Sequence, residues 1–159
     1  SLIRMQKNEQ KTISAMVDVP ACVLAEDKRL DDWLIKFKRN KFKLSQLYFR
    51  ITDKSVFDWG IETVKTLKEK GVHWVLALPK YDALKVLEEH ADLIDYVYFD
   101  ASDSLFKQPA MLSLFTPSRR IYLMVGGIQD NETMTLFKSY HVSLMMGNLF
   151  IHDVSLDTL

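Results

Sequence analysis

The chain of 159 residues is 48% hydrophobic and 26% charged, the composition of one globular domain. Lys plus Arg total 21, as do Asp plus Glu, so the formal net charge is zero. This balance argues against a dedicated nucleic-acid binder, which usually carries a basic excess. No apolar run approaches the roughly 20 residues needed to cross a bilayer, and the N-terminus lacks a signal-peptide layout. With a single cysteine, Cys22, the sequence predicts a cytoplasmic protein.

Six short apolar runs, rich in β-branched and aromatic residues, have the length of buried strands. In chain order they span residues 13–19, 47–52, 72–78, 94–99, 121–125 and 142–146. The stretches between them have the periodicity of amphipathic helices. In the first of these, one apolar stripe at i, i+3, i+4 and i+7 is formed by Leu30, Trp33, Leu34 and Phe37.

A second helix is predicted over residues 61–67. Asp53 or Ser55 is its expected N-cap, and Gly71 its C-terminal glycine. A further short helix is expected to begin at Asp82.

Strand–helix–strand units repeated about every 20–30 residues predict parallel strands joined by right-handed crossovers. Two folds satisfy this pattern: a doubly wound open sheet and a (β/α) barrel. No strand is followed by a Rossmann glycine fingerprint or a P-loop, and the residues at the strand ends favour the barrel. We therefore predict an α/β, TIM-barrel-like fold in one domain over residues 1–159, incomplete because only about six of the usual eight units are present.

Functional side chains of a (β/α) barrel follow the carboxyl ends of its strands. The residues at those positions here are Asp18, Arg50, Asp53, Pro79, Lys80, Asp100, Gly126, Gly127, Gln129, Gly147 and Asn148. Arg50 stands out, because strand alternation points it away from the side of Phe49, and a charge there must be paired or solvated. Asp18, Asp53 or Asp100 is its expected partner. Such a pair would either plug the barrel mouth as a structural element or form part of a ligand site.

The sequence contains no evident cluster of metal ligands. Its four His residues have neither the i, i+4 spacing of a zinc helix nor neighbouring cysteines. Two acidic pairs, Asp31-Asp32 and Glu88-Glu89, are interpreted as solvated helix faces. Five basic residues within 36–43 are interpreted in the same way, with a phosphate or nucleic-acid patch as the alternative.

Four blocks of sequence carry a further signal. They are LSQLYFRITDKSV (44–56), VKTLKEKGVHWVLALPKYDAL (64–84), ADLIDYVYFDAS (91–102) and MVGGIQDNETMTLFKSYHVSLMMGNLF (124–150). In this order they resemble the EAL-domain family of bacterial cyclic di-GMP phosphodiesterases, and the resemblance extends from about Ile13 to Phe150. Members of that family are (β/α) barrels that use divalent metals to hydrolyse the dinucleotide. The resemblance therefore implies a barrel from a bacterial signalling protein, of which this chain is the C-terminal portion.

The resemblance also implies that most metal-binding positions are replaced in this chain. The family's metal-binding Asn falls on Asp18, and the Glu of its L-E-I-T block falls on Arg50. Its Asp-Asp pair falls on Pro79 and Lys80. Two-metal hydrolysis needs several carboxylates around the ions, and cations at these positions oppose metal binding.

The later strands show the same departures. The family's catalytic Lys falls on Tyr98, whereas the Asp two residues later persists as Asp100. The Glu of its A-E-G-V-E block falls on Gly126 and the following Glu on Gln129. The E-A-L tripeptide region is absent. The resemblance thus implies a degenerate domain with its Mg/Mn site lost, and we expect no cofactor and no catalysis.

These observations predict a catalytically inactive, EAL-like regulatory module that acts through protein–protein contacts. Residual cyclic di-GMP recognition stays open, at the positions Asp18, Arg50, Asp53, Lys80, Asp100, Gly126, Gly127 and Gln129. An incomplete barrel exposes strand edges, which favours a protein partner or self-association, with the missing strands upstream in a longer protein as the other option. The alternative function is a phosphate-binding (β/α)-barrel enzyme that uses the Gly126-Gly127 loop.

Overall fold

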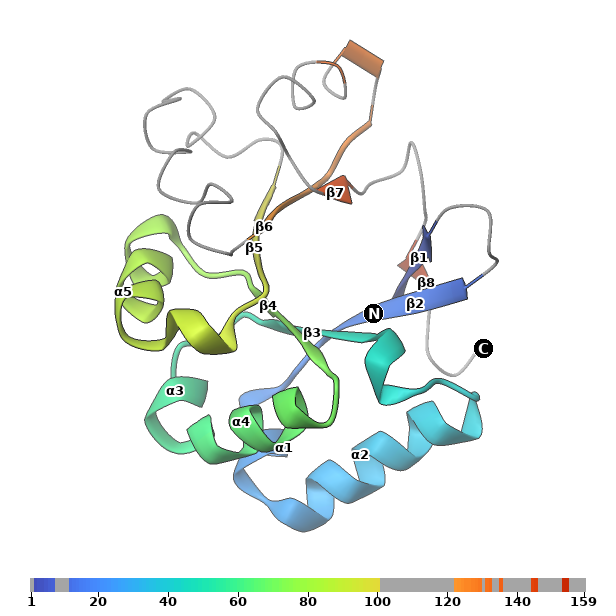
Figure 1. The fold of residues 1–159 in the computed structure, drawn as a ribbon, viewed down its shortest axis with the longest axis vertical. Helices are drawn as coiled ribbons and strands as arrows, with labels where there is room; N and C mark the ends of the chain where they lie inside the picture. The colour runs from blue at the N-terminus through green and yellow to red at the C-terminus, as the bar shows by residue number, and fades with distance from the viewer. Residues whose placement is uncertain are drawn as a thin grey trace.

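The computed structural model describes two long stretches of the chain, residues 12–100 and 122–129. Shorter described pieces lie at 2–7, 131–132, 135, 144–145 and 153–154. A single curved sheet runs through these residues, and the helices lie along one side of it (Figure 1). No helix in the described part of the chain combines the length and apolar character needed to cross a membrane.

Six parallel strands form most of the sheet. They are β2 (Thr12–Asp18), β3 (Leu47–Ile51), β4 (His73–Leu76), β5 (Tyr96–Asp100), β6 (Tyr122–Gly126) and β7 (Leu144–Met145). Each pairs in parallel with the next along the chain, and together they curl into a half-barrel. The expected α/β fold, an incomplete TIM-barrel-like sheet, is confirmed, as are all six predicted strands.

Two further strands extend the β2 edge of the sheet. Strand β1 (Leu2–Lys7) pairs antiparallel with β2, and β8 (Asp153–Val154) pairs antiparallel with β1. The strand order is therefore β7-β6-β5-β4-β3-β2-β1-β8. The sequence pattern did not predict these two strands, because β1 precedes β2 without an intervening helix and two residues are too few to show alternation.

Between residues 21 and 90, which the structure describes throughout, five α-helices cover the outer side of the parallel strands. They are α1 (Ala21–Ala25), α2 (Asp27–Arg39), α3 (Val56–Trp59), α4 (Ile61–Glu69) and α5 (Lys80–His90), with 3-10 turns at Leu44–Gln46 and Ala91–Leu93. The predicted apolar stripe of α2 packs on the core, as its spacing requires. Helix α5 begins two residues before the predicted start at Asp82, directly after Pro79.

The predicted N-cap of the second long helix is wrong. The chain breaks at Gly60 into the short α3 and the longer α4, so Gly60 is the N-cap residue of α4, whereas Ser55 occupies the N-cap position of α3 without a side-chain hydrogen bond. A Cβ atom at Gly60 would lie 2.9 Å from the carbonyl oxygen of Val56, so this close turn requires glycine. The predicted end is confirmed, since Gly71 follows α4 with a φ of +104°.

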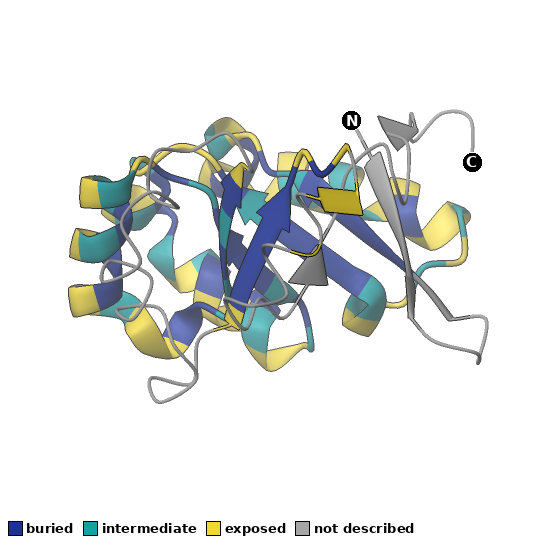
Figure 2. Cartoon of the chain, turned by 90° about the horizontal axis from the view of Figure 1, so that it is seen from above, coloured by how far each residue is buried: buried dark blue, intermediate teal, exposed yellow. Residues whose placement is uncertain are grey.

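The main core lies between the helices and the sheet. Trp74 is fully buried there, packs edge-on against Phe49 at 5.6 Å between ring centroids, and donates its indole N–H to the carbonyl of Val64 at 3.1 Å. In Figure 2 the central strands are largely dark blue and the helices are yellow on their outer turns. A second, smaller cluster lies on the opposite face of the strands and includes Met16, Tyr48, Val75 and Met124.

Candidate functional site

Arg50 occupies the position that strand alternation predicts. Its neighbours Phe49 and Ile51 are fully buried in the helix-side core, whereas Arg50 projects from the other face of β3. The β2–β3 register places Asp18 directly opposite Arg50. The Arg50 Nε donates to Asp18 Oδ1, and Nη2 donates to Oδ2 at 3.0 Å. Of the three acids expected as partners, the structure thus pairs Arg50 with Asp18, in a two-point interaction that fixes the guanidinium.

Tyr98 on β5 completes the surroundings of this pair. The Arg50 Cζ lies 4.7 Å from the centre of the Tyr98 ring, a cation–π contact. Burial opposes the charge of Arg50, but the hydrogen bond and negative charge of Asp18, followed by Tyr98, outweigh it and raise the pKa of Arg50. The guanidinium side chain is only 16% exposed. A permanent positive charge therefore stands at the carboxyl end of β3.

The glycines of β6 and its following loop are close to the side chains of β5. A Cβ atom at Gly126 would lie 1.7 Å from the Tyr98 hydroxyl oxygen, so Tyr98 occupies the space that any side chain at 126 would need. Gly127 has a φ of +73°, and a Cβ atom there would lie 2.7 Å from Asp100 Oδ2. Asp18, Arg50, Tyr98 and Gly126 therefore form one connected row across the mouth of the half-barrel, which we call the strand-end row.

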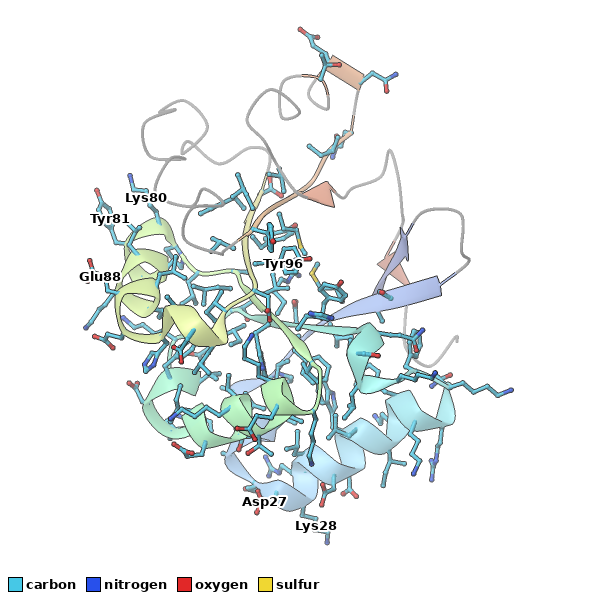
Figure 3. All side chains as sticks on the ribbon, in the orientation of Figure 1. Asp27, Lys28, Lys80, Tyr81, Glu88 and Tyr96 are labelled. Atoms are coloured by element: carbon cyan, nitrogen blue, oxygen red, sulfur yellow. The ribbon has the colours of Figure 1, made fainter. Side chains whose placement is uncertain are left out.

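Three other candidate residues have surroundings that do not include a residue of the strand-end row. Lys80 is the first residue of α5, and its Nζ lies 4.9 Å from the centre of the Tyr81 ring, at the outer end of that helix in Figure 3. Asp53 accepts the backbone N–H of Ser55 at 2.9 Å, and this hydrogen bond lowers the pKa of the exposed Asp53. Gln129 is exposed in the loop after β6. The predicted Gly147 and Asn148 lie outside the described residues.

Tyr98 was not among the candidate site residues, although strand alternation in the sequence places it on the same face as the candidate Asp100. On β5 it lies two residues before Asp100, so alternation places both on one face. Tyr96, two residues before Tyr98, lies on the same face of β5. The centroid of its ring is 5.7 Å from that of Tyr48 and 5.8 Å from that of Tyr122. The interior below the strand-end row is therefore lined by aromatic rings, with Tyr96 at its centre (Figure 3).

The strand-end row does not fit a divalent cation. Both oxygens of the Asp18 carboxylate accept from Arg50, and the guanidinium places a positive charge where a metal ion would need anionic ligands. In residues 14–100 and 122–129 no three His, Cys, Asp or Glu side chains come together as a metal site. What the row offers is a fixed cation beside an aromatic ring, an arrangement suited to holding an anion or a polar partner group.

Neither a scan of protein-family models nor a search of curated proteins found a match to this sequence. Solved structures do match it. The manganese and cyclic di-GMP complex of BlrP1 from Klebsiella pneumoniae is 17% identical, with a TM-score of 0.68 over 86% of this chain and 38% of that one. The EAL enzyme Bd1971, bound to cAMP and cyclic di-GMP, is 12% identical, with a TM-score of 0.69 over 90% and 41% of the two chains.

An EAL-domain protein from Listeria monocytogenes EGD-e is 16% identical, with a TM-score of 0.62 over 83% of this chain and 57% of that one. In each comparison the chain spans less than two thirds of the matched structure. At these identities the likeness shows a shared fold. Over most of its length, the chain is structurally similar to EAL-domain cyclic di-GMP phosphodiesterases, as a partial domain.

Proposed function

We propose that this chain is an EAL-like regulatory module that does not hydrolyse cyclic di-GMP and that acts through protein contacts. The observation that carries the proposal is the strand-end row, in which Asp18 is engaged by Arg50 and the space beside Gly126 is filled by Tyr98. A two-metal hydrolase needs anionic ligands at that end of the barrel to hold its ions and generate hydroxide. The row supplies a guanidinium, a phenol and a glycine instead.

If the chain still recognises cyclic di-GMP, the positive charge of Arg50 would bind a phosphate of the dinucleotide in place of a metal ion. A guanidinium has five N–H donors; Asp18 accepts two and Tyr98 engages a further one, so Arg50 still has donors to offer a phosphate oxygen. The Asp18 carboxylate repels that phosphate, which limits the affinity. We therefore propose weak, metal-independent binding of cyclic di-GMP at Arg50.

The structure favours this reading over a phosphate-binding enzyme built on the Gly126-Gly127 loop. Backbone N–H groups of such a loop hold phosphate only where an anion can approach them. Here the Tyr98 hydroxyl lies against Gly126 and the Asp100 carboxylate against Gly127. A phosphate would have to displace the Tyr98 hydroxyl and would be repelled by the negative charge of Asp100.

Isothermal calorimetry and a hydrolysis assay together test the proposal. The chain is titrated with cyclic di-GMP with and without Mn²⁺, and the products are separated after prolonged incubation. We expect no hydrolysis and weak heats that do not depend on the metal. Formation of the linear dinucleotide at a rate proportional to protein concentration contradicts the proposal.

Two variants of the same ion pair sharpen the calorimetry. Asp18→Asn removes the repelling charge but keeps a hydrogen-bond acceptor, so it should tighten cyclic di-GMP binding several-fold. Arg50→Gln should abolish binding. Because Arg50→Gln leaves Asp18 without its partner, circular dichroism must first show that the variant is folded. Equal affinities of both variants and the unmodified chain contradict a site at Arg50.

A further inference from the structure

A groove of about 440 Å³ lies between α2 and α4, on the outer side of the half-barrel and away from the strand-end row. Leu30 and Leu34 of α2 are half-buried along it, and Leu67 of α4, only 1% exposed, lies at its base. Thr63 and Thr66 line the α4 side, and both hydroxyls already donate to backbone carbonyls. The groove therefore has an apolar floor with little unused hydrogen-bonding capacity.

The two helices run in the same direction along the groove. At one end, the Thr63 hydroxyl near the start of α4 donates to the carbonyl of Leu24, just before α2, at 3.4 Å. At the other end, Gly71 follows α4 and lies against Ser45, which follows α2; a Cβ atom at Gly71 would be 3.7 Å from the Ser45 Cα. The N-terminal ends of α2 and α4 thus share one end of the groove.

The charges along the groove separate by sign. Asp27 and Glu62 lie at its N-terminal end, where Figure 3 shows Asp27, Asp31 lies one turn further along α2, and Lys70 lies at the opposite end. Within the described residues, Asp27, Asp31 and Lys70 form no ion pair. Glu62 contacts Lys65 at 3.2 Å, but this exposed pair is too weak to hold the carboxylate against a competing cation. The groove is therefore negative at one end and positive at the other.

We propose that this groove binds an amphipathic helix of a partner protein, with an acidic N-terminal turn and a basic C-terminal turn. Asp27 and Leu34 are seven residues apart, so the groove is about 10 Å long, or two helical turns. Two turns accept apolar anchors at i, i+3, i+4 and i+7. The basic turn lies against Asp27, Asp31 and Glu62, and the acidic turn against Lys70.

The direction of the partner follows from electrostatics. Basic side chains are most favourable at the C-terminus of a helix and acidic ones at its N-terminus. A partner with this usual distribution complements the groove only if it runs antiparallel to α2 and α4. In one respect the inference rests on the proposed function, because it identifies the surface through which a regulatory module makes its contacts.

The test uses two synthetic 18-residue helical peptides of identical composition. The first has Glu in its first turn, Leu at i, i+3, i+4 and i+7, and Lys and Arg in its last turn; in the second the charged turns are exchanged. Fluorescence anisotropy at low salt measures binding of each to the full chain. We expect the first peptide to bind about tenfold more tightly, the effect of two or three surface charge pairs. Equal affinities, or no binding of either peptide, overturn the proposal.

Charge reversal in the groove provides the matched control. Asp27→Lys combined with Asp31→Lys should remove the preference for the first peptide, and Lys70→Glu alone should weaken it. Asp92→Lys changes the same charge at an exposed position that does not line the groove and should change nothing. A preference that survives the groove variants, or is lost equally in Asp92→Lys, overturns the site. These peptide affinities do not depend on hydrolysis, so an active chain that still discriminates the peptides would contradict the proposed function alone.

Discussion

The two faces of the parallel strands are built from different chemistry. The helix-side face is a continuous apolar core in which Trp74, Phe49 and Leu76 are completely buried. The interior face holds a small cluster of Met and Tyr side chains below the Asp18–Arg50 ion pair. The first face supplies most of the buried apolar area, and hence most of the stability. A half-barrel can therefore keep its fold through one face while the other face carries polar residues suited to a different task.

The largest effect on stability is expected from a substitution in the core on the helix-side face. Trp74→Ala removes a fully buried ring that packs on Phe49 and leaves the carbonyl of Val64 without its donor. We expect a loss of about 3–5 kcal/mol in the free energy of unfolding, measured by urea denaturation. Trp74→Phe keeps much of the packing and should cost less. If both variants cost less than the interior substitution below, the helix-side face does not dominate the stability.

A smaller effect is expected on the interior face, at the contact between Tyr98 and Gly126. Gly126→Ala places a methyl group where the Tyr98 hydroxyl lies, and we expect it to cost about 1–3 kcal/mol of unfolding free energy. In a Tyr98→Ala background the space is open, so the same substitution should cost much less. A double-mutant cycle by urea denaturation measures this coupling. Additive costs would show that Tyr98 does not occupy the space above Gly126.

The smallest effect concerns pH. Burial, followed by the influence of Tyr48, raises the pKa of Tyr96 to about 12, above the ordinary tyrosine value. Because the folded state holds this proton more tightly, Tyr96 contributes stability that is fully present below the unfolded pKa of about 10 and is lost as the pH rises towards 12. Ultraviolet titration of tyrosinate should show a late-titrating group that is missing in Tyr96→Phe. An unchanged titration curve would contradict this burial.

Much of this fold could be predicted from local pattern, because strand alternation and helix periodicity are properties of neighbouring residues. Alternation alone placed Arg50 on the face opposite Phe49. It could not choose Asp18 as the partner, since that choice depends on the register between β2 and β3, which are about 30 residues apart. The row from Asp18 to Gly126 likewise depends on four strands meeting at one edge.

Other features depend on contacts that no local pattern contains. The turn at Gly60 requires glycine because a side chain there would meet Val56 and Leu24, which belong to different elements. The groove forms only where α2 and α4 lie side by side. In the sequence of either helix alone, the charged residues are typical of an ordinary solvated face. Alternation did contain the signal for Tyr98, two residues before Asp100. Its role became clear only beside Arg50 and Gly126.

The central claim is that the strand-end row holds an arginine–aspartate pair where a hydrolase would hold metal ions. Electron paramagnetic resonance of Mn²⁺ tests it most directly, because the signal of the free ion falls when the ion binds. With the full chain in excess over Mn²⁺, with and without cyclic di-GMP, we expect the free-ion signal to stay unchanged. A loss of signal that reaches one or two ions per chain, and that disappears in Asp18→Asn, would contradict the account.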